Sequence, residues 1–137
     1  MQIDSQTYIA KLVAPSNWEE CVYRYCTFER FNEDGLHVTS AFLDCRFESC
    51  DLYWALFNTA VLVGVGFKNC VFRGCSFSGC CFVECRFDGC SFENDNLGGP
   101  CRFDETRWYG CAQSQSQGLD HVWVPPLAID EPIDLRR

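Results

Sequence analysis

The chain of 137 residues carries a net charge of −8 and holds twelve cysteines and twelve phenylalanines. This length predicts a single domain, and no apolar run approaches the roughly 20 residues of a membrane-spanning helix. An acidic surface repels phosphate, so direct binding of nucleic acid is not expected. Residues 1–20 show neither the basic start nor the apolar core of a signal peptide, which predicts a cytoplasmic protein.

The N-terminal part of the chain shows only broken patterns. Residues 1–20 are expected to form a capping segment, because their apolar side chains could cover an exposed strand edge. The stretch from Tyr8 to Val13 fits a short helix and a short strand equally well, and Pro15 ends it. Residues 29–39 are predicted to form a projecting loop, a kind of segment that often carries function on a rigid scaffold.

Residues 40–99 repeat with a period of five. An apolar residue stands at every fifth position, and a small or short residue stands two places before each of them, as Cys75 does before Phe77. The apolar series is Phe42, Phe47, Leu52, Phe57, Leu62, Phe67, Phe72, Phe77, Phe82, Phe87, Phe92 and Leu97. A period of five is neither the 3.6 of a helix nor the 2 of a strand, so the pattern predicts a repeat architecture.

The unit C-x-F-x-x, as in residues 75–79 and 85–89, resembles the repeat of the pentapeptide-repeat family. The resemblance implies an all-β fold, a right-handed quadrilateral β-helix in which four units make one coil and residues 20 apart stack. The helix is expected to span residues 21–111 in about four coils, with short irregular flanks at both ends. Its axis is expected to be filled by the apolar series, which we call the core ladder.

The cysteines follow the same period. Nine of the twelve occupy the small inward position of full or broken units: residues 21, 26, 45, 50, 70, 75, 80, 85 and 90. Buried free cysteine behaves as a small hydrophobic residue, which predicts a packing role with reduced thiols. No C-x-x-C pair occurs and only His37 and His121 accompany the thiols, so no metal, cofactor or catalytic residue is predicted. The column of Cys50, Cys70 and Cys90 is the nearest approach to a metal site.

One outer face of the predicted helix is apolar. The second and fourth places of each unit point outward, and those around Phe42, Leu62 and Phe82 are all apolar. They are Ala41, Leu43, Val61, Val63, Cys81 and Val83. The other three faces are mixed or polar. Tyr53, Trp54 and Leu56 are predicted to extend the apolar surface round the nearest corner, and aromatic residues of this kind favour interfaces.

Three occupants of this apolar face are compatible with the sequence, because a soluble protein seldom leaves a contiguous apolar patch bare. Residues 112–137 are predicted to form a flexible linker, 112–118, followed by a tail whose apolar run Val122–Ile129 could fold over the face. The second occupant is another copy of the chain in a homodimer. The third is a different protein.

The sequence therefore predicts a protein-binding module without enzymatic activity, of the immunity, adaptor or effector-associated kind. The family resemblance implies an alternative, since some members resemble a DNA duplex, bind DNA gyrase or topoisomerase IV, and protect it from inhibitors. Residues 40–99 contain seven acidic and four basic side chains. A DNA mimic needs denser acidic columns, about one charge per 1.7 Å of axis, and for this reason we rank topoisomerase protection second.

Overall fold

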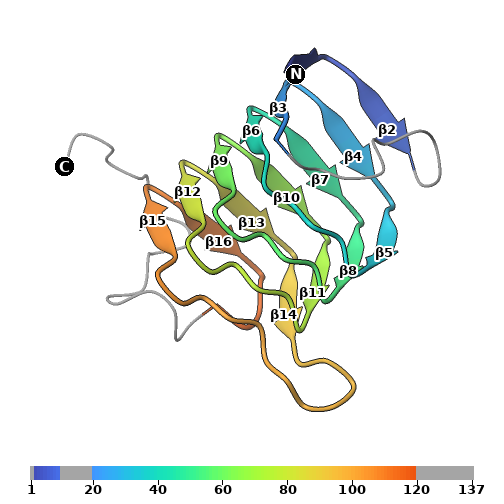
Figure 1. Cartoon of the computed structure of the whole chain (residues 1–137), viewed down its shortest axis with the longest axis vertical. Coiled ribbons are helices and arrows are strands. Elements are labelled where there is room, and N and C mark those ends of the chain that lie inside the picture. The colour runs from blue at the N-terminus through green and yellow to red at the C-terminus, as the bar shows by residue number, and fades with distance from the viewer. Residues whose placement is uncertain (1, 10–19, 120–137) are drawn as a thin grey trace.

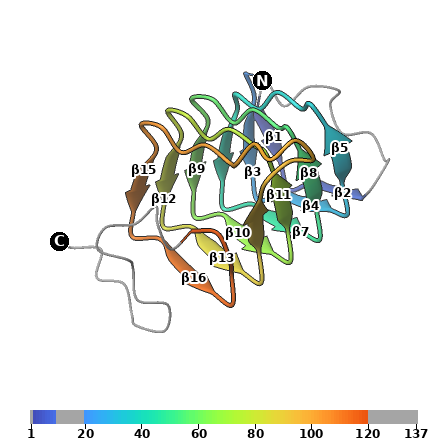
Figure 2. The ribbon, with the colours of Figure 1, turned by 90° about the horizontal axis from the view of Figure 1, so that it is seen from below.

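The computed structural model describes residues 2–9 and 20–119, which form sixteen three-residue β-strands and no helix. Successive strands lie on successive sides of a four-sided coil, and each strand pairs in parallel with the strand one coil later (Figures 1 and 2). Four complete coils run from β3 to the bridge residue Arg102. The predicted fold class is therefore confirmed.

Three sheets and one bridged side enclose the core. The first sheet contains β1 (Gln2–Asp4), β3 (Val22–Arg24), β6 (Ala41–Leu43), β9 (Val61–Val63), β12 (Cys81–Val83) and β15 (Arg107–Tyr109). The second contains β2 (Thr7–Ile9), β4 (Thr27–Glu29), β7 (Arg46–Glu48), β10 (Gly66–Lys68), β13 (Arg86–Asp88) and β16 (Ala112–Ser114). The third contains β5 (Asn32–Asp34), β8 (Asp51–Tyr53), β11 (Val71–Arg73) and β14 (Ser91–Glu93). The fourth side is held by single parallel bridges linking His37, Leu56, Ser76 and Arg102.

The aromatic rings of the core ladder stack from coil to coil. Phe47 lies between Phe28 and Phe67, with ring centroids 4.7 and 5.1 Å away and interplanar angles of 12°. This spacing is close to the roughly 4.8 Å between paired strands, so ring stacking and backbone pairing share one repeat distance. Eleven of the twelve ladder residues are buried. The exception is Leu97.

Leu97 is 85% exposed, and Phe103 takes its expected place, stacked on Phe77 with ring centroids 5.3 Å apart. Ser76 pairs with Arg102, so the step between coils rises here from 20 residues to 26. The six additional residues lie within a loop, 94–100, that projects below β14 in Figure 1. The prediction that Leu97 belongs to the core ladder was wrong. Its position in the sequence fits the five-residue period, but its backbone has already left the coil.

Residues 29–39, predicted as a projecting loop, instead continue the coil. They contribute the end of β4, then β5 and the bridge residue His37, and Phe31 and Val38 are buried. The step from this coil to the next is 19 residues, as the pairing of Val22 with Ala41 shows. The period was hidden because a polar residue, Glu33, holds the ladder position and one unit is a residue short.

The N-terminal and C-terminal flanks also extend the β-helix. In the N-terminal segment β1 and β2 pair with β3 and β4 at the regular 20-residue step. At the other end β16 pairs with β13, so residues 112–118 are part of the solenoid and the predicted linker was wrong there. The apolar run Val122–Ile129 lies outside the described residues.

All twelve cysteines are free thiols, and nine are buried. Their Sγ atoms donate to backbone carbonyls of the preceding coil, as Cys75 does to Leu52 (3.3 Å) and Cys85 to Leu62 (3.3 Å). Two hydroxyl residues at the small position make the same bond: Thr106 donates to the Phe77 carbonyl at 2.7 Å and Ser116 to the Phe87 carbonyl at 3.0 Å. The thiols therefore fill space and also donate a weak hydrogen bond between coils.

We expect Phe77→Ala to lower the free energy of unfolding by about 3–5 kcal/mol, because the ring is fully enclosed by other rings. Leu97→Ala, at a ladder position by sequence alone, should change it by less than about 0.5 kcal/mol. Chemical denaturation of both variants measures these values. Similar losses for both would contradict the exposed loop.

The thiols give a second test of the core. Burial raises the pKa of Cys45 to about 11 and also raises the pKa of Cys80, so both stay protonated and unreactive at neutral pH. In the native protein at pH 7 we expect a maleimide to modify no thiols rapidly beyond the partly exposed Cys21, Cys81 and Cys101. All twelve should react in denaturant, which is the control. Rapid native labelling of the buried nine would mean that the coils open readily.

Candidate functional site

The outer surface of the first sheet carries a contiguous apolar patch, which we call the apolar face. It consists of Ala41, Leu43, Val61, Val63, Cys81 and Val83. Ala41 pairs in register with Val61 and then Cys81, while Leu43 pairs with Val63 and then Val83, so two apolar columns run side by side. All six side chains keep solvent exposure, and Val61 is 39% exposed.

The ends of the apolar face are marked by arginines. On β3 only one of the two outward residues, Val22, is apolar and extends the Ala41 column. The other outward residue is Arg24. At the far end β15 contributes Arg107 and the exposed Tyr109. Three strands at roughly 4.8 Å spacing cover about 10 Å from the first to the last. A stable interface buries about 800 Å² on each partner, so a partner bound here must also contact an adjoining side.

Tyr53 and Trp54 do not adjoin the apolar face. Tyr53 ends β8 in the third sheet, and Trp54 forms the corner that follows it. The second sheet lies between the third sheet and the first, so the prediction that these two residues continue the patch was wrong. Leu56 lies on the fourth side, where it bridges His37 and Ser76.

Tyr53 and Trp54 instead hold the 94–100 loop. The Trp54 indole Nε1 donates to Asp95 Oδ2 at 2.8 Å, and the Asn96 amide donates to the Tyr53 hydroxyl at 3.0 Å. Asp95 Oδ1 also accepts from the backbone amides of Leu97 (2.8 Å) and Gly99 (2.7 Å). These bonds fix an exposed loop that presents Leu97 at its tip. The hydrogen bond from the Trp54 indole has the largest effect on Asp95, and the bond from the Gly99 amide the next largest; both lower the pKa of this carboxyl group.

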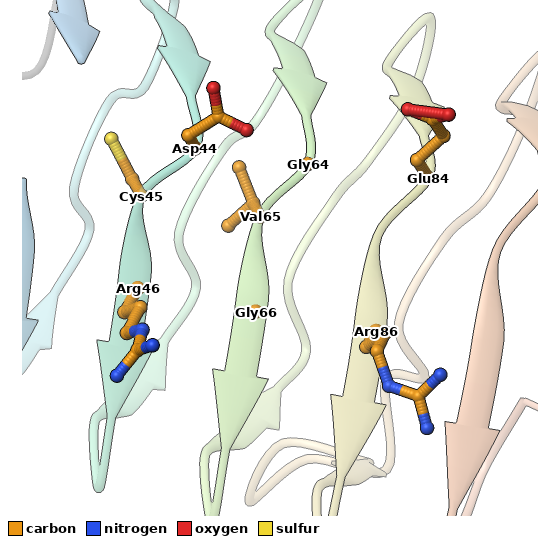
Figure 3. A pocket seen from close by; sticks show the side chains of 8 residues that line it. All are labelled: Asp44, Cys45, Arg46, Gly64, Val65, Gly66, Glu84 and Arg86. Atoms are coloured by element: carbon orange, nitrogen blue, oxygen red, sulfur yellow. The ribbon is translucent and has the colours of Figure 1, made fainter. Parts of the chain in front are cut away.

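A recess of about 330 Å³ opens at the corner between the first and second sheets (Figure 3). Its floor is Gly64, Val65 and Gly66, and its sides carry Asp44, Glu84, Arg46 and Arg86. The corner residues Asp44, Gly64 and Glu84 directly follow Leu43, Val63 and Val83 in the chain, so the recess borders the apolar face. The sequence signal for it was two arginines at 20-residue steps from a central glycine.

The described residues offer little for other site chemistries. Within residues 2–9 and 20–119 no three His, Cys, Asp or Glu side chains are grouped to hold a metal ion. No helix of sufficient length and apolar character to cross a bilayer occurs in the same residues. His37 lies on the fourth side, and His121 lies outside the described part of the chain.

A sequence model of pentapeptide repeats, nine copies long, matches residues 62–107. Residues 62–107 are therefore pentapeptide repeats. The resemblance stated from the C-x-F-x-x unit is thus confirmed, and the structure extends the same coil on both sides of the matched residues. No curated protein sequence matches the chain.

Solved pentapeptide-repeat structures align with it at low identity. A trypsin-treated form of QnrB1, a plasmid-mediated fluoroquinolone resistance protein, is 13% identical with a TM-score of 0.41, covering 85% of this chain and 71% of that one. Full-length QnrB1 is 11% identical with a TM-score of 0.30, covering 94% and 91%. Rfr23 from the cyanobacterium Cyanothece 51142 is 8% identical with a TM-score of 0.35, covering 85% and 86%.

The loop contacts yield a pH prediction. Because the pKa of Asp95 is lowered, its contribution to loop order is present above the usual aspartate pKa and is lost as pH falls through the lowered value. The Trp54 indole N–H resonance should therefore shift on acidification with a midpoint below that of exposed aspartates. Asp95→Asn should remove this titration. A Trp54 signal that is insensitive to pH would contradict the bond.

Proposed function

We propose that this chain is a cytoplasmic, non-enzymatic protein-binding module of the immunity, adaptor or effector-associated kind, whose apolar face docks on another protein. The observation that carries the proposal is that three successive strands of the first sheet present no polar side chain outward. Contiguous apolar patches of this kind mark interaction sites on soluble proteins. The scaffold beneath is held by ring stacking and backbone pairing, so little order has to be gained on binding.

The contrast with the other sides supports this assignment. In the second sheet Lys68 pairs in register with Glu48 and Asp88. In the third sheet Arg73 lies 3.3 Å from Asp51 and 4.0 Å from Glu93. These sides therefore satisfy their own charges or remain solvated, and they supply no comparable reason for a partner to displace water.

Protection of DNA gyrase or topoisomerase IV by DNA mimicry is the second candidate, and the net charge of −8 favours it. The charge placement argues against it, because Lys68 and Arg73 interrupt the acidic positions of the second and third sheets. A surface that imitates a duplex needs regularly spaced, unneutralised acids. A second copy of this chain is also less favoured as the partner, since two chains of this net charge repel each other.

The test is Val63→Glu, which places a charge at the centre of the apolar face. Val71→Glu makes the same change on the third sheet, at another partly exposed valine of a central strand, and is the matched control. We expect a tagged chain to capture one protein from extract of its host, and the capture to fall about tenfold or more for Val63→Glu but not for Val71→Glu.

The outcomes separate the alternatives. Light scattering that gives a dimer for the wild type and a monomer for Val63→Glu would assign the face to a second copy. Retention of purified gyrase or topoisomerase IV by both variants would support topoisomerase protection through another side. Equal capture by Val63→Glu and the wild type would show that the apolar face is not the binding site.

A further inference from the structure

Gly66 in the recess is not required by the fold. Its backbone lies outside the left-handed region, and a Cβ atom added to it would meet no other atom within 4 Å. Gly64 differs, because its φ is +67° and a Cβ there would lie 2.5 Å from Asp44 Oδ1. Glycine weakens a strand interior, and one that the backbone does not need often marks the close approach of a ligand or of another chain.

The glycine interrupts a column of positive charge. Gly66 pairs in register with Arg46 on one side and with Arg86 on the other. Figure 3 shows the Arg46 guanidinium over its own strand and the Arg86 guanidinium directed away from Gly66, so the position between the two arginines is open. Among the described residues neither arginine takes part in an ion pair. In the next outward column of this sheet Glu48, Lys68 and Asp88 alternate in sign. The arginine column lacks the central negative charge that would make it alternate as well.

Elsewhere the chain shows what such a charge would contact. Arg24 and Asp4 are register neighbours on adjacent strands, and their side chains form two hydrogen bonds of 3.0 and 3.2 Å. Arg73 reaches carboxylates on both of its neighbouring strands. The two arginines of the recess are separated by two strand spacings, roughly 9.6 Å. A carboxylate level with Gly66 would stand one strand spacing from each arginine, and rotation of the Arg86 side chain toward it would let both guanidinium groups bind it in the planar pairing that arginine favours.

The source of that carboxylate follows from the other charges of the recess. Asp44 and Glu84 stand at its corner end and balance the two arginines, so a free anion gains little from the overall field. A carboxylate presented by a protein already docked on the adjoining apolar face has a high effective concentration instead. The recess also supplies the contact on a second side that the small apolar face requires.

We propose that the recess binds the carboxylate of an aspartate or glutamate side chain of a partner protein, held between Arg46 and Arg86 level with Gly66. This inference rests on the proposed function, since the same partner contacts the apolar face. The partner surface is then an apolar patch with an acidic side chain at its edge.

A carboxylate built into the recess tests the charge preference without any partner. Gly66→Glu supplies that group in cis, and Gly66→Gln is the uncharged control of the same shape. At pH 7 and low salt we expect Gly66→Glu to melt about 2–5 °C above Gly66→Gln. The difference should vanish in 1 M NaCl and in the Arg46→Gln/Arg86→Gln background. Equal melting temperatures at low salt would overturn the proposal.

Partner capture tests the assignment itself. Arg46→Gln/Arg86→Gln leaves the recess open but uncharged, and should reduce capture of the partner about tenfold or more. Arg102→Gln, at a bridge position on the fourth side, is the control and should not change it. If the double variant captures normally while Val63→Glu does not, the recess assignment is wrong and the proposed function stands. If Val63→Glu captures normally, the proposed function fails, whatever the recess variants show.

Discussion

The stacking of one coil on the next at a single repeat distance is the constraint on which the rest of the structure depends. Parallel strand pairing and ring stacking both require about 4.8 Å, and Phe67 and Phe87 meet this requirement with ring centroids 4.8 Å apart. Because both interactions act on the same residue of each unit, a strand that slips loses both. Side chains 20 residues apart are therefore held in fixed columns, so residues at that interval in the sequence determine the chemistry of each outer side.

The same constraint explains where the sequence was sufficient and where it misled. The five-residue period, repeated twelve times, was enough to predict the fold class and the two columns of the apolar face. It placed Leu97 in the core because local spacing cannot tell whether the backbone has left the coil. What decides is the better ladder residue six positions later, Phe103, whose ring covers Phe77.

The prediction for residues 29–39 failed in the opposite way, since Glu33 at a ladder position and a unit one residue short concealed a regular coil. The recess was missed for a third reason, because it depends on a side chain that is lacking at Gly66 and on the charges to either side of it.

The preference for cysteine at the small inward position has a physical reason that size alone does not supply. Alanine would fill a similar space but could not donate to the carbonyl of the preceding coil, as the thiols, Thr106 and Ser116 do. A protonated thiol is both a small apolar group and a weak donor. Burial favours that protonated form by raising the pKa of Cys45 and Cys80. Metal binding needs the thiolate, so the burial that makes Cys45 and Cys80 good packing elements opposes their use as ligands.

The four-sided cross-section determines which surface features one partner can contact together. The apolar face and the recess share an edge, because the residues that directly follow its strands, Asp44, Gly64 and Glu84, line the recess. The 94–100 loop is tied to Trp54 at the corner between the third sheet and the fourth side, diagonally across the coil from the recess. A partner resting flat on the first sheet can therefore reach Arg46 and Arg86 but not Leu97.

The exposed Leu97 belongs to a separate surface. The bonds around Asp95 allow the coil to resume in register at Arg102 after six additional residues, so the loop has a structural reason of its own. The apolar face and the recess remain as one continuous surface whose two chemistries, apolar and cationic, are complementary to one protein partner with an acidic side chain at the edge of an apolar patch.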